Sequence, residues 1–338
     1  MLNDSVKHIL RQACRQPDEP LNILTFPTHE RYETNLCKTG HNFYAFRADG
    51  IKDWNTNYGD VPSNYMLLNP EKQMDQIPPY VDFDIILSQN KAGQFQIAKQ
   101  LSEQMHVPLV SLEHTLPFPE WGEEPLSQMR NMRGNFNVFI SEYSYDAWGW
   151  KVDNDTGVIH HGIDSQQFKP SETVQKEDHI LSVVNDWINR DWCCGFGLWQ
   201  NVIKGLPHRV VGDTPGLSEP AKTTDDLVKE YQSSRIFLNT SSISPVPTAL
   251  LEAMSCGCAV VSTATCMIPE IIKNEENGFI SNDPNKLKQY LVDLLNDEGL
   301  AKEMGQKARE TILEHFSLES FIKRWDKVLG MASNFLVW

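Results

Sequence analysis

The chain has 338 residues, enough for two domains of ordinary size, and 40% of them are hydrophobic. Its 45 acidic and 30 basic residues give a formal net charge of -15, which argues against a broad nucleic-acid surface because such surfaces rely on lysine and arginine. The seven cysteines include no Cys-x-x-Cys pair. This pattern excludes a zinc ribbon and indicates reduced thiols in a cytoplasmic compartment.

Residues 1–20 are predicted to be a helical N-terminal extension. They are charged and lack a long apolar run, so we expect neither a signal peptide nor a membrane span there. Val6, Ile9, Leu10 and Ala13 recur at helical spacing, which predicts a short amphipathic helix packed on the body of the protein by these side chains.

Residues 21–165 alternate predicted strands with helices. Short apolar runs bounded by polar residues predict strands at residues 21–26, 84–88, 109–112 and 137–141. A helix with one apolar face is expected between the second and third of these strands. The alternation favours a parallel sheet with crossover helices, which is a Rossmann-like domain.

Residues 41–80 are rich in Asn, Asp, Tyr and Pro and are predicted to be an irregular excursion. Trp54 within it is expected to fill a local core, although an aromatic ring beside polar groups can also stack on a sugar or a base. Asp82 and Asp84 have the spacing of a metal-binding Asp-x-Asp. Because Asp84 leads directly into an apolar run, we interpret the pair as the entry to a strand and expect no metal site.

The loop of residues 27–33 follows the first predicted strand, at the sheet edge where open α/β proteins bind ligands. It supplies His29, Glu30 and Arg31 as candidate contacts for an acceptor or a donor. An equally good interpretation is structural, with Thr28 capping the helix that follows.

A second α/β domain is predicted over residues 179–315, followed by a helical tail at 316–338. Its strands are expected at residues 180–184, 208–212, 236–239, 259–262 and 278–280. A polar loop after the third of these leads to a helix that begins near Pro247, a residue favoured at the first helical position, and ends at Gly257.

The start of that helix is a predicted anion site. The amides of Thr248 and Ala249 lie at a helix N-terminus beyond the carboxyl end of a parallel strand, where orphan N–H groups and the helix dipole favour a phosphate. Glu252, one turn further on, is then suitably placed to accept hydrogen bonds from ribose hydroxyls. The alternative is a solvated surface glutamate.

Residues 236–272 resemble the donor-binding motif of the family 4 glycosyltransferases, which are retaining enzymes of the GT-B fold. The resemblance rests on residues 251–257 (Leu-Glu-Ala-Met-Ser-Cys-Gly), on the strand at 259–262 and on Ile-Pro-Glu at 268–270. It implies two Rossmann-like, doubly wound α/β domains facing a cleft, with the tail at 316–338 crossing back to the N-terminal domain. It also implies a UDP-sugar as co-substrate, with no cofactor required.

The same resemblance assigns the donor-binding positions. Glu252 corresponds to the ribose ligand, and the remaining donor-binding candidates are Thr248, Ala249, Ser244, Val246 and Gly212. The chain departs from the family at two points. Ser244 replaces the first acid of the family's pair, and Pro-Val-Pro at 245–247 replaces a glycine turn.

Two residues are expected by resemblance to be catalytic. His114 corresponds to the histidine that meets the donor sugar after the third strand, and its neighbour Glu113 is a weaker candidate. Relatives neutralise the donor diphosphate with an arginine and a lysine, and this chain offers Arg190, with Lys204 as the fallback. An arginine can bind phosphate through two parallel hydrogen bonds.

The missing acid at Ser244 suggests front-side attack, in which the leaving diphosphate accepts the proton of the acceptor hydroxyl. A trapped covalent glycosyl-enzyme would contradict this hypothesis. The motifs do not specify the acceptor, which stays open between a glycan, a small molecule, a lipid and modified DNA.

The segment 25–41 resembles the start of phage-encoded glycosyltransferases, which raises hydroxymethylated cytosine in phage DNA as a specific acceptor in the host cytoplasm. That acceptor needs a local basic patch, to which Lys91, Lys99, Arg130 and Arg133 could contribute. Two other classes remain as alternatives, a nucleotide-sugar epimerase or hydrolase of the same fold and a non-catalytic nucleotide-sugar-binding protein.

Overall fold

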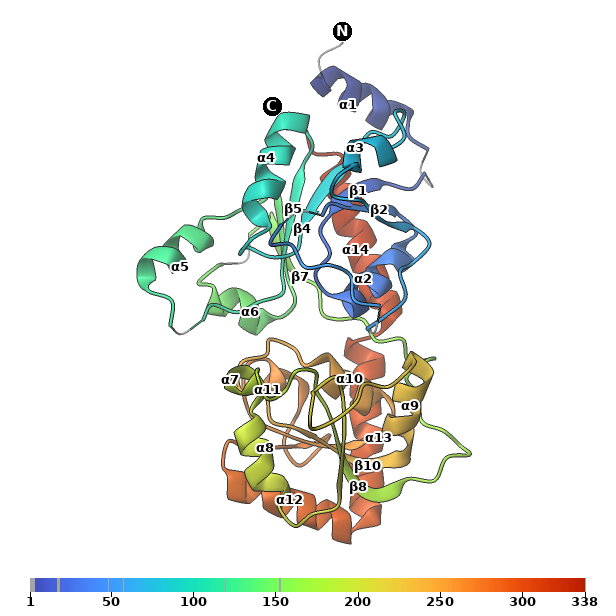
Figure 1. Ribbon diagram of the computed structural model, residues 1–338, viewed down its shortest axis with the longest axis vertical. Coiled ribbons are helices and arrows are strands. Elements are labelled where there is room, and N and C mark those ends of the chain that lie inside the picture. The colour runs from blue at the N-terminus through green and yellow to red at the C-terminus, as the bar shows by residue number, and fades with distance from the viewer. Residues whose placement is uncertain are drawn as a thin grey trace. The chain divides into compact units, whose positions relative to one another are not determined.

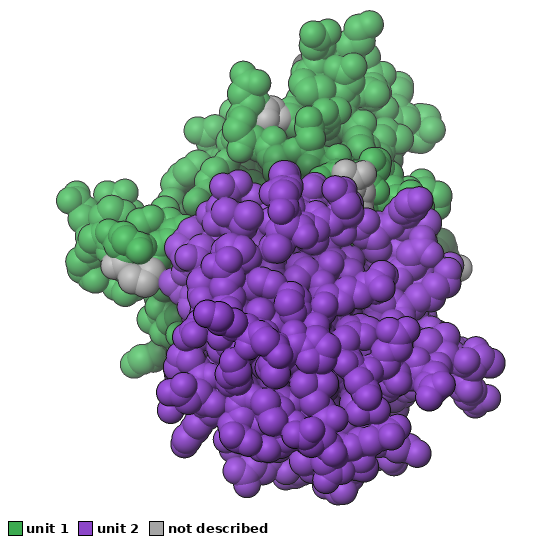
Figure 2. Space-filling view, turned by 60° about the horizontal axis from the view of Figure 1, so that its bottom comes forward, with its two compact units in different colours: residues 1–160, 319–338 green, residues 161–318 purple. Residues whose placement is uncertain are grey.

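The computed structural model describes residues 4–16, 19–47, 49–56, 58–118, 120–151 and 153–337. The chain divides into two compact units, coloured separately in Figure 2. Unit 1 comprises residues 1–160 and 319–338, and unit 2 comprises residues 161–318. Each unit is built on one parallel β-sheet.

The described part of unit 1 contains a seven-stranded sheet in the order β3-β2-β1-β4-β5-β6-β7. All neighbouring strands are parallel. The strands are β1 (Asn22–Thr25), β2 (Asn42–Ala45), β3 (Tyr65–Leu67), β4 (Ile85–Ser88), β5 (Leu109–Glu113), β6 (Phe136–Phe139) and β7 (Thr156–Val158). The strand order reverses between β1 and β4, which makes their carboxyl ends the expected ligand-binding point of this sheet.

Helices accompany this sheet in the alternating manner that the sequence predicts (Figure 1). They are α1 (Asp4–Cys14), α2 (Glu30–Leu36), the 3₁₀ helix η1 (Cys37–Thr39), α3 (Gln73–Gln76), α4 (Phe95–Met105), α5 (Glu123–Arg130), α6 (Glu142–Ala147) and, at the far end of the chain, α14 (Leu318–Ser333). α14 packs through Trp325, which is fully buried and donates its indole N–H to the Tyr32 hydroxyl at 2.9 Å. The tail of the chain is thus part of the core of unit 1.

The helix α1 is present, but the prediction of its packing face was wrong. Val6, Ile9 and Leu10 are exposed. The opposite face contacts the protein, where Arg11 and Arg15 form ion pairs with the buried Asp84 carboxylate. A buried charge must be paired, so this ion pair and not the apolar stripe sets the orientation of α1. Asp84 directly precedes β4, so it stands at the entry to a strand as predicted.

The prediction of an irregular segment at 41–80 was also wrong in part, because β2 and β3 lie within it. Phe43 and Tyr65 are paired across these two strands and are both buried. Short strands in a segment rich in Asn and Pro give little periodic signal. Trp54 fills a local core, as predicted, and its indole N–H donates to the Gly59 carbonyl at 2.8 Å.

The described part of unit 2 contains a five-stranded parallel sheet in the order β12-β11-β10-β8-β9. Its strands are β8 (Glu177–Val183), β9 (His208–Val211), β10 (Ser234–Asn239), β11 (Ala259–Ser262) and β12 (Phe279–Ile280). Its helices are α7 (Asp191–Cys194), α8 (Phe196–Ile203), α9 (Thr224–Ser233), α10 (Thr248–Ser255), α11 (Ile268–Ile271), α12 (Pro284–Asn296) and α13 (Glu298–His315). Here the strand order reverses between β8 and β10, so the ligand-binding point lies at the carboxyl ends of these two strands.

The core of unit 2 explains why its strands were predictable. β10 and β11 are buried along most of their length, and both read as continuous apolar runs, which is typical of a parallel sheet covered on both faces. One core cluster joins Ile236 and Val261 of these strands to Leu291 of α12. All predicted strands of both units are present, with ends that differ by at most three residues.

Candidate functional site

The loops that follow β8 and β10 are joined to each other at the carboxyl edge of unit 2. The amides of Ser242 and Ile243 donate to the Cys193 carbonyl at 2.9 and 3.1 Å, and the Ser242 hydroxyl donates to the Trp192 carbonyl at 3.0 Å. These contacts fix the segment 184–195 against the segment 240–247. The two segments therefore form one hydrogen-bonded rim at the point where the strand order reverses, and we call segments 184–195 and 240–247 the unit 2 rim.

Gly195 makes this close approach possible. Its φ is +66°, and an added Cβ would lie 2.1 Å from the Thr240 carbonyl oxygen. An L-residue is therefore excluded by space and strained in conformation.

The N-terminus of α10 has the predicted free donors. Pro247 is the N-cap, and it provides no side-chain hydrogen bond. The first helical bonds are donated by Leu250 and Leu251 to the Pro247 carbonyl, whereas among the described residues the amides of Thr248 and Ala249 have no acceptor. Pro247 thus stands one position earlier than expected, and the two amides remain suitable donors to an anion.

Glu252 is buried, so the alternative interpretation of a solvated surface glutamate is wrong. Its side chain projects from an α10 turn surrounded by apolar residues, and the residue is 4% exposed. The Tyr231 hydroxyl donates to its Oε2 at 3.0 Å. A carboxylate in such a place must be hydrogen-bonded, and ribose hydroxyls are donors of the required kind.

The remaining donor-site candidates lie on the same edge. Arg190 is exposed at the start of α7, and its guanidinium donates to the Asn185 carbonyl at 3.4 Å. Gly212 follows β9, and an added Cβ there would lie 2.0 Å from the Val184 carbonyl, so it packs one loop against another. Ser244 is half-buried and Val246 is buried in the loop before α10. Helix α8 starts at this edge and runs away from it. Lys204 follows the C-terminal end of α8 and is therefore away from the edge.

At the reversal point of unit 1, a buried carboxylate organises the loop after β1. Glu33 accepts hydrogen bonds from the amides of Thr28 and His29, both at 2.9 Å. It also accepts one from the Gln89 side chain at 2.8 Å and one from the Tyr65 hydroxyl. Burial raises the pKa of Glu33 above its ordinary value. Neither Glu33 nor Gln89 was predicted, although Gln89 directly follows a predicted strand at the functional edge.

Two candidate histidines lie together at this point. The rings of His29 and His114 stack with centroids 5.8 Å apart, and the Tyr32 ring meets His114 edge-on at 4.5 Å. His114 Nε2 is 3.4 Å from Oε1 of the Gln89 side chain. His114 directly follows β5 and lies at the reversal point. It contacts the loop of residues 27–33, which the sequence predicts separately as a ligand-binding loop.

His29, and not Thr28, caps α2. Its Nδ1 accepts the Tyr32 amide at 3.3 Å, so the neutral ring carries its proton on Nε2. Burial lowers the pKa of His29 to about 4. His29 is therefore neutral at physiological pH.

The two acidic candidates of unit 1 have structural partners. Glu30 is buried and accepts from the Lys52 ammonium at 2.7 Å and from the Asn55 amide at 2.9 Å. Glu113 accepts from the amides of Lys91 and Thr115, both at 2.8 Å, and burial raises its pKa. Arg31 is half-buried at the start of α2. These contacts show that Glu30 and Glu113 hold the loops around them.

The basic residues considered for a DNA acceptor are already engaged. Arg130 pairs with Glu123 at 2.6 Å, Arg133 pairs with Asp153 at 2.9 Å, and Lys99 pairs with Glu103. Lys91 is buried and donates to the Met132 carbonyl. The four side chains therefore supply no argument for a nucleic-acid surface.

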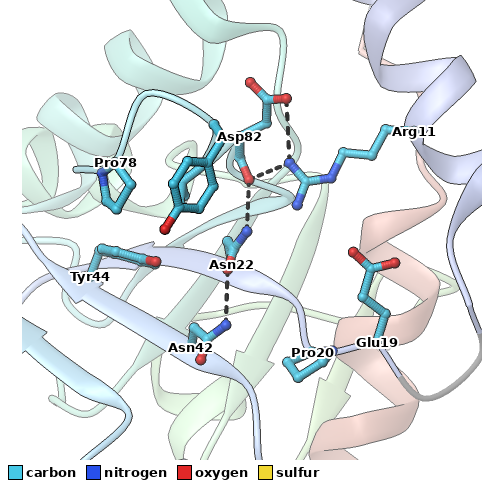
Figure 3. A pocket seen from close by; sticks show the side chains of 10 residues that line it. Arg11, Glu19, Pro20, Asn22, Asn42, Tyr44, Pro78 and Asp82 are labelled. Carbon is cyan, nitrogen blue, oxygen red and sulfur yellow. Dashed lines mark hydrogen bonds and ion pairs between the residues drawn. The ribbon is translucent and has the colours of Figure 1, made fainter.

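A hollow of about 540 Å³ lies at the opposite edge of the unit 1 sheet (Figure 3). Asn22 and Asn42, the first residues of β1 and β2, line it and are hydrogen-bonded to each other at 3.1 Å. It is at the amino ends of these strands and so is separate from the reversal point. In the described ranges no group of three metal-binding side chains was found, and no helix is long and apolar enough to cross a membrane.

Comparison with known proteins assigns part of unit 2 to a family. Residues 220–311, which run from the loop before α9 into α13, match the family model described as "Glycosyl transferases group 1". The chain contains a group 1 glycosyltransferase domain. The matched segment includes the free amides of α10 and Glu252, so the predicted anion site lies within the family's own region.

Curated relatives match the chain over part of their length. The N-acetyl-alpha-D-glucosaminyl L-malate synthase of Bacillus anthracis is 29% identical over 106 residues, which is 31% of this chain and 28% of the relative. An uncharacterised glycosyltransferase of Haemophilus influenzae is matched over 31% of its length. The chain thus spans about a third of these relatives.

Solved structures match almost the whole chain. HepE of Anabaena in complex with UDP-glucose superposes with a TM-score of 0.72 at 15% identity, covering 92% of this chain and all of that one. Sucrose-phosphate synthase from Thermosynechococcus elongatus superposes with a TM-score of 0.70 at 13% identity, covering 92% of this chain and 98% of that one. The chain therefore has the GT-B fold, as predicted.

Proposed function

We propose that the protein is a retaining glycosyltransferase that moves a sugar from a nucleoside diphosphate, most simply UDP, to an acceptor hydroxyl. The observation that carries the proposal is the α10 N-terminus, where two amides without acceptors precede a buried carboxylate inside the group 1 glycosyltransferase segment. The structure of HepE with UDP-glucose, on the same fold, supports UDP as the nucleotide.

The donor is held by unit 2 in this proposal. The diphosphate accepts hydrogen bonds from the amides of Thr248 and Ala249, where the helix dipole also favours negative charge. Arg190 supplies the positive charge from the facing loop, and Glu252 accepts the ribose hydroxyls while Tyr231 fixes its carboxylate. Ser244, Val246 and Gly212 shape the loops around the nucleotide.

Unit 1 contributes the stacked histidines. His29 caps α2 through its Nδ1. His114 is oriented by the Gln89 side-chain amide and by the edge of Tyr32. We propose from the family resemblance that His114 hydrogen-bonds a hydroxyl group of the transferred sugar and stabilises charge as the glycosidic bond breaks, with His29 as a candidate contact of the acceptor.

The proposed reaction is front-side attack. The segment 240–247 carries no carboxylate, since Ser244 and the prolines stand there, so it offers no protein nucleophile for a covalent intermediate. The C1–O bond to the diphosphate breaks as the acceptor oxygen bonds to C1 on the same face. The acceptor proton passes to the departing phosphate oxygen, whose negative charge is balanced by Arg190 and the α10 amides.

A turnover screen tests the proposal. The protein is incubated with UDP-glucose or UDP-N-acetylglucosamine, and UDP release is measured alone and with pools of glycans, hydroxy acids and hydroxymethylcytosine-containing DNA. Release that depends on one pool, with sugar found on it in the α configuration of the donor, is the expected result. Release without any acceptor would indicate a hydrolase or epimerase, and binding without release in every pool would indicate a non-catalytic binding protein.

A further inference from the structure

Two adjacent thiols lie at the rim of the unit 2 site and have no part in the proposed reaction. Cys193 and Cys194 are the last residues of α7, and their Sγ atoms are 3.6 Å apart. Both residues are buried. This separation is a non-bonded sulfur contact, and a disulfide requires the two atoms to approach to about 2.05 Å.

The backbone of this pair holds the rim together. The Cys193 carbonyl accepts from Ser242 and Ile243 of the facing loop. The Cys194 carbonyl accepts from the Trp187 indole at 2.9 Å and from the Thr240 hydroxyl at 3.2 Å. A rotation of the peptide between the two cysteines therefore moves the Cys193 carbonyl and breaks its contacts with the facing loop.

The surroundings of Cys193 favour its reaction. A hydrogen bond with Cys194, together with the charge of Arg190, lowers the pKa of Cys193 below its ordinary value. A lower pKa increases the thiolate fraction, and the thiolate is the form that attacks oxidants. Cys194 supplies the second thiol at contact distance.

We propose that Cys193 and Cys194 form a site of reversible oxidation by peroxides, and that the disulfide weakens nucleotide binding at the same rim. The oxidation of the two cysteines is inferred from the thiol pair alone. Its effect on nucleotide binding rests on the proposed function.

The oxidation consumes one peroxide and needs no other reactant. The Cys193 thiolate attacks hydrogen peroxide, forming a sulfenic acid and releasing hydroxide, which takes up a proton to become water. The Cys194 sulfur then attacks the sulfenic sulfur, loses its proton and expels a second water. Two thiols and one peroxide thus give one disulfide and two waters.

The geometry of adjacent residues predicts both reversibility and an effect on the loops. Neighbouring Cα atoms are about 3.8 Å apart across a trans peptide, whereas most disulfides join Cα atoms that are roughly 4.4–6.8 Å apart. Closing the ring therefore distorts the peptide whose carbonyl accepts from Ser242 and Ile243. Bonds distorted in this way are reduced more readily than structural disulfides.

Mass spectrometry combined with nucleotide titration tests the proposal. Trypsin cleavage after Arg190 and Lys204 gives a peptide of residues 191–204 that contains both cysteines and no other cysteine. After hydrogen peroxide treatment of the full chain, we expect this peptide to lose two hydrogen atoms and to resist alkylation. We expect the affinity for UDP to fall at least about tenfold and to recover with dithiothreitol.

Three variants serve as controls. Cys193→Ser and Cys194→Ser should each abolish the disulfide and the peroxide effect on UDP affinity, whereas Cys14→Ser, at an exposed thiol of unit 1, should leave both unchanged. Continued alkylation of residues 191–204 under conditions that oxidise Cys14 would overturn the modification site. A disulfide without a change in UDP affinity would overturn its effect on binding. A reduced protein that does not bind UDP would instead refute the proposed function, and the peptide mass would still decide the modification site.

Discussion

Glu252 carries the most specific prediction at the scale of single residues. Replacing it with Gln keeps the size of the side chain and its Tyr231 partner but removes the negative charge that strengthens hydrogen bonds from ribose. We expect Glu252→Gln to weaken UDP binding about tenfold or more, measured by isothermal titration calorimetry.

Glu303→Gln is the matched control, because Glu303 is exposed on α13 and only pairs with Lys307. It should leave UDP affinity unchanged. Equal affinities of the Glu252→Gln variant and the wild type would remove Glu252 from the site.

His29 provides a prediction about pH. Its pKa is about 4 in the folded protein against an ordinary value of 6.5, so between these values the unfolded chain binds more protons and the folded state loses stability as the pH falls. A difference of this size corresponds to about 3 kcal/mol once the pH falls below the folded value. In His29→Asn, which keeps a capping acceptor, this loss should be absent.

Denaturant unfolding at pH 7 and pH 4.5 measures the effect of His29. Glu33 and Glu113 have raised pKa values, which make stability change in the opposite direction, but both are present in wild type and variant alike. The difference between the two proteins therefore isolates His29. Parallel pH profiles would contradict the assignment of a neutral, buried imidazole.

The residues of the two sites were predictable to different degrees. Glu252, Thr248 and Ala249 lie within one short segment, so a local motif was enough to find them. Glu33 and Gln89 are 56 positions apart in the chain and meet through a single hydrogen bond. No local pattern reports such a contact. The burial that lowers the pKa of His29 is likewise a property of the folded loop and not of its sequence.

Gly195 makes a prediction at the scale of elements. Gly195→Ala places a Cβ 2.1 Å from the Thr240 carbonyl and should separate the two loops of the unit 2 rim. We expect a destabilisation of more than about 3 kcal/mol and loss of UDP binding, measured by denaturant unfolding and calorimetry.

Gly205→Ala is the control for Gly195, because Gly205 also has a positive φ, of +81°, but has no atom within 4 Å of the added Cβ. It should cost only the conformational strain, about 1–2 kcal/mol, and should retain UDP binding. Equal effects of the two substitutions would show that the contact between the loops is unimportant.

Elements were predictable where burial was complete. β10 and β11 are covered on both faces, and their apolar runs mark them plainly. β2, β3 and β7 were missed because they are three or four residues long and mix polar with apolar side chains. The orientation of α1 was misjudged since a pairing of charges with Asp84 outweighed its apolar stripe.

At the scale of the whole molecule, we expect a core substitution in unit 1 and nucleotide binding to unit 2 to change the stability of different units. Trp325 is fully buried in unit 1 although it belongs to the last helix of the chain. Trp325→Ala should destabilise unit 1 by about 3–5 kcal/mol. UDP should stabilise unit 2, because binding to the folded state alone shifts the unfolding equilibrium.

Thermal unfolding followed by limited proteolysis separates these two effects. In Trp325→Ala, the first cleavages should fall in residues 20–160, and UDP should still protect residues 161–318. The matched control is Trp192→Ala, in which an exposed tryptophan of unit 2 is removed and the stability of unit 1 should not change. Simultaneous cleavage of both units in Trp325→Ala would contradict their independence.

Hydrogen exchange with and without UDP locates the bound nucleotide amide by amide. We expect slower exchange in the segments 184–195 and 240–252, with the largest change at the start of α10, where Thr248 and Ala249 have no acceptor in the described structure. Protection confined to residues 20–160, or no protection by any nucleoside diphosphate, would contradict nucleotide binding by unit 2.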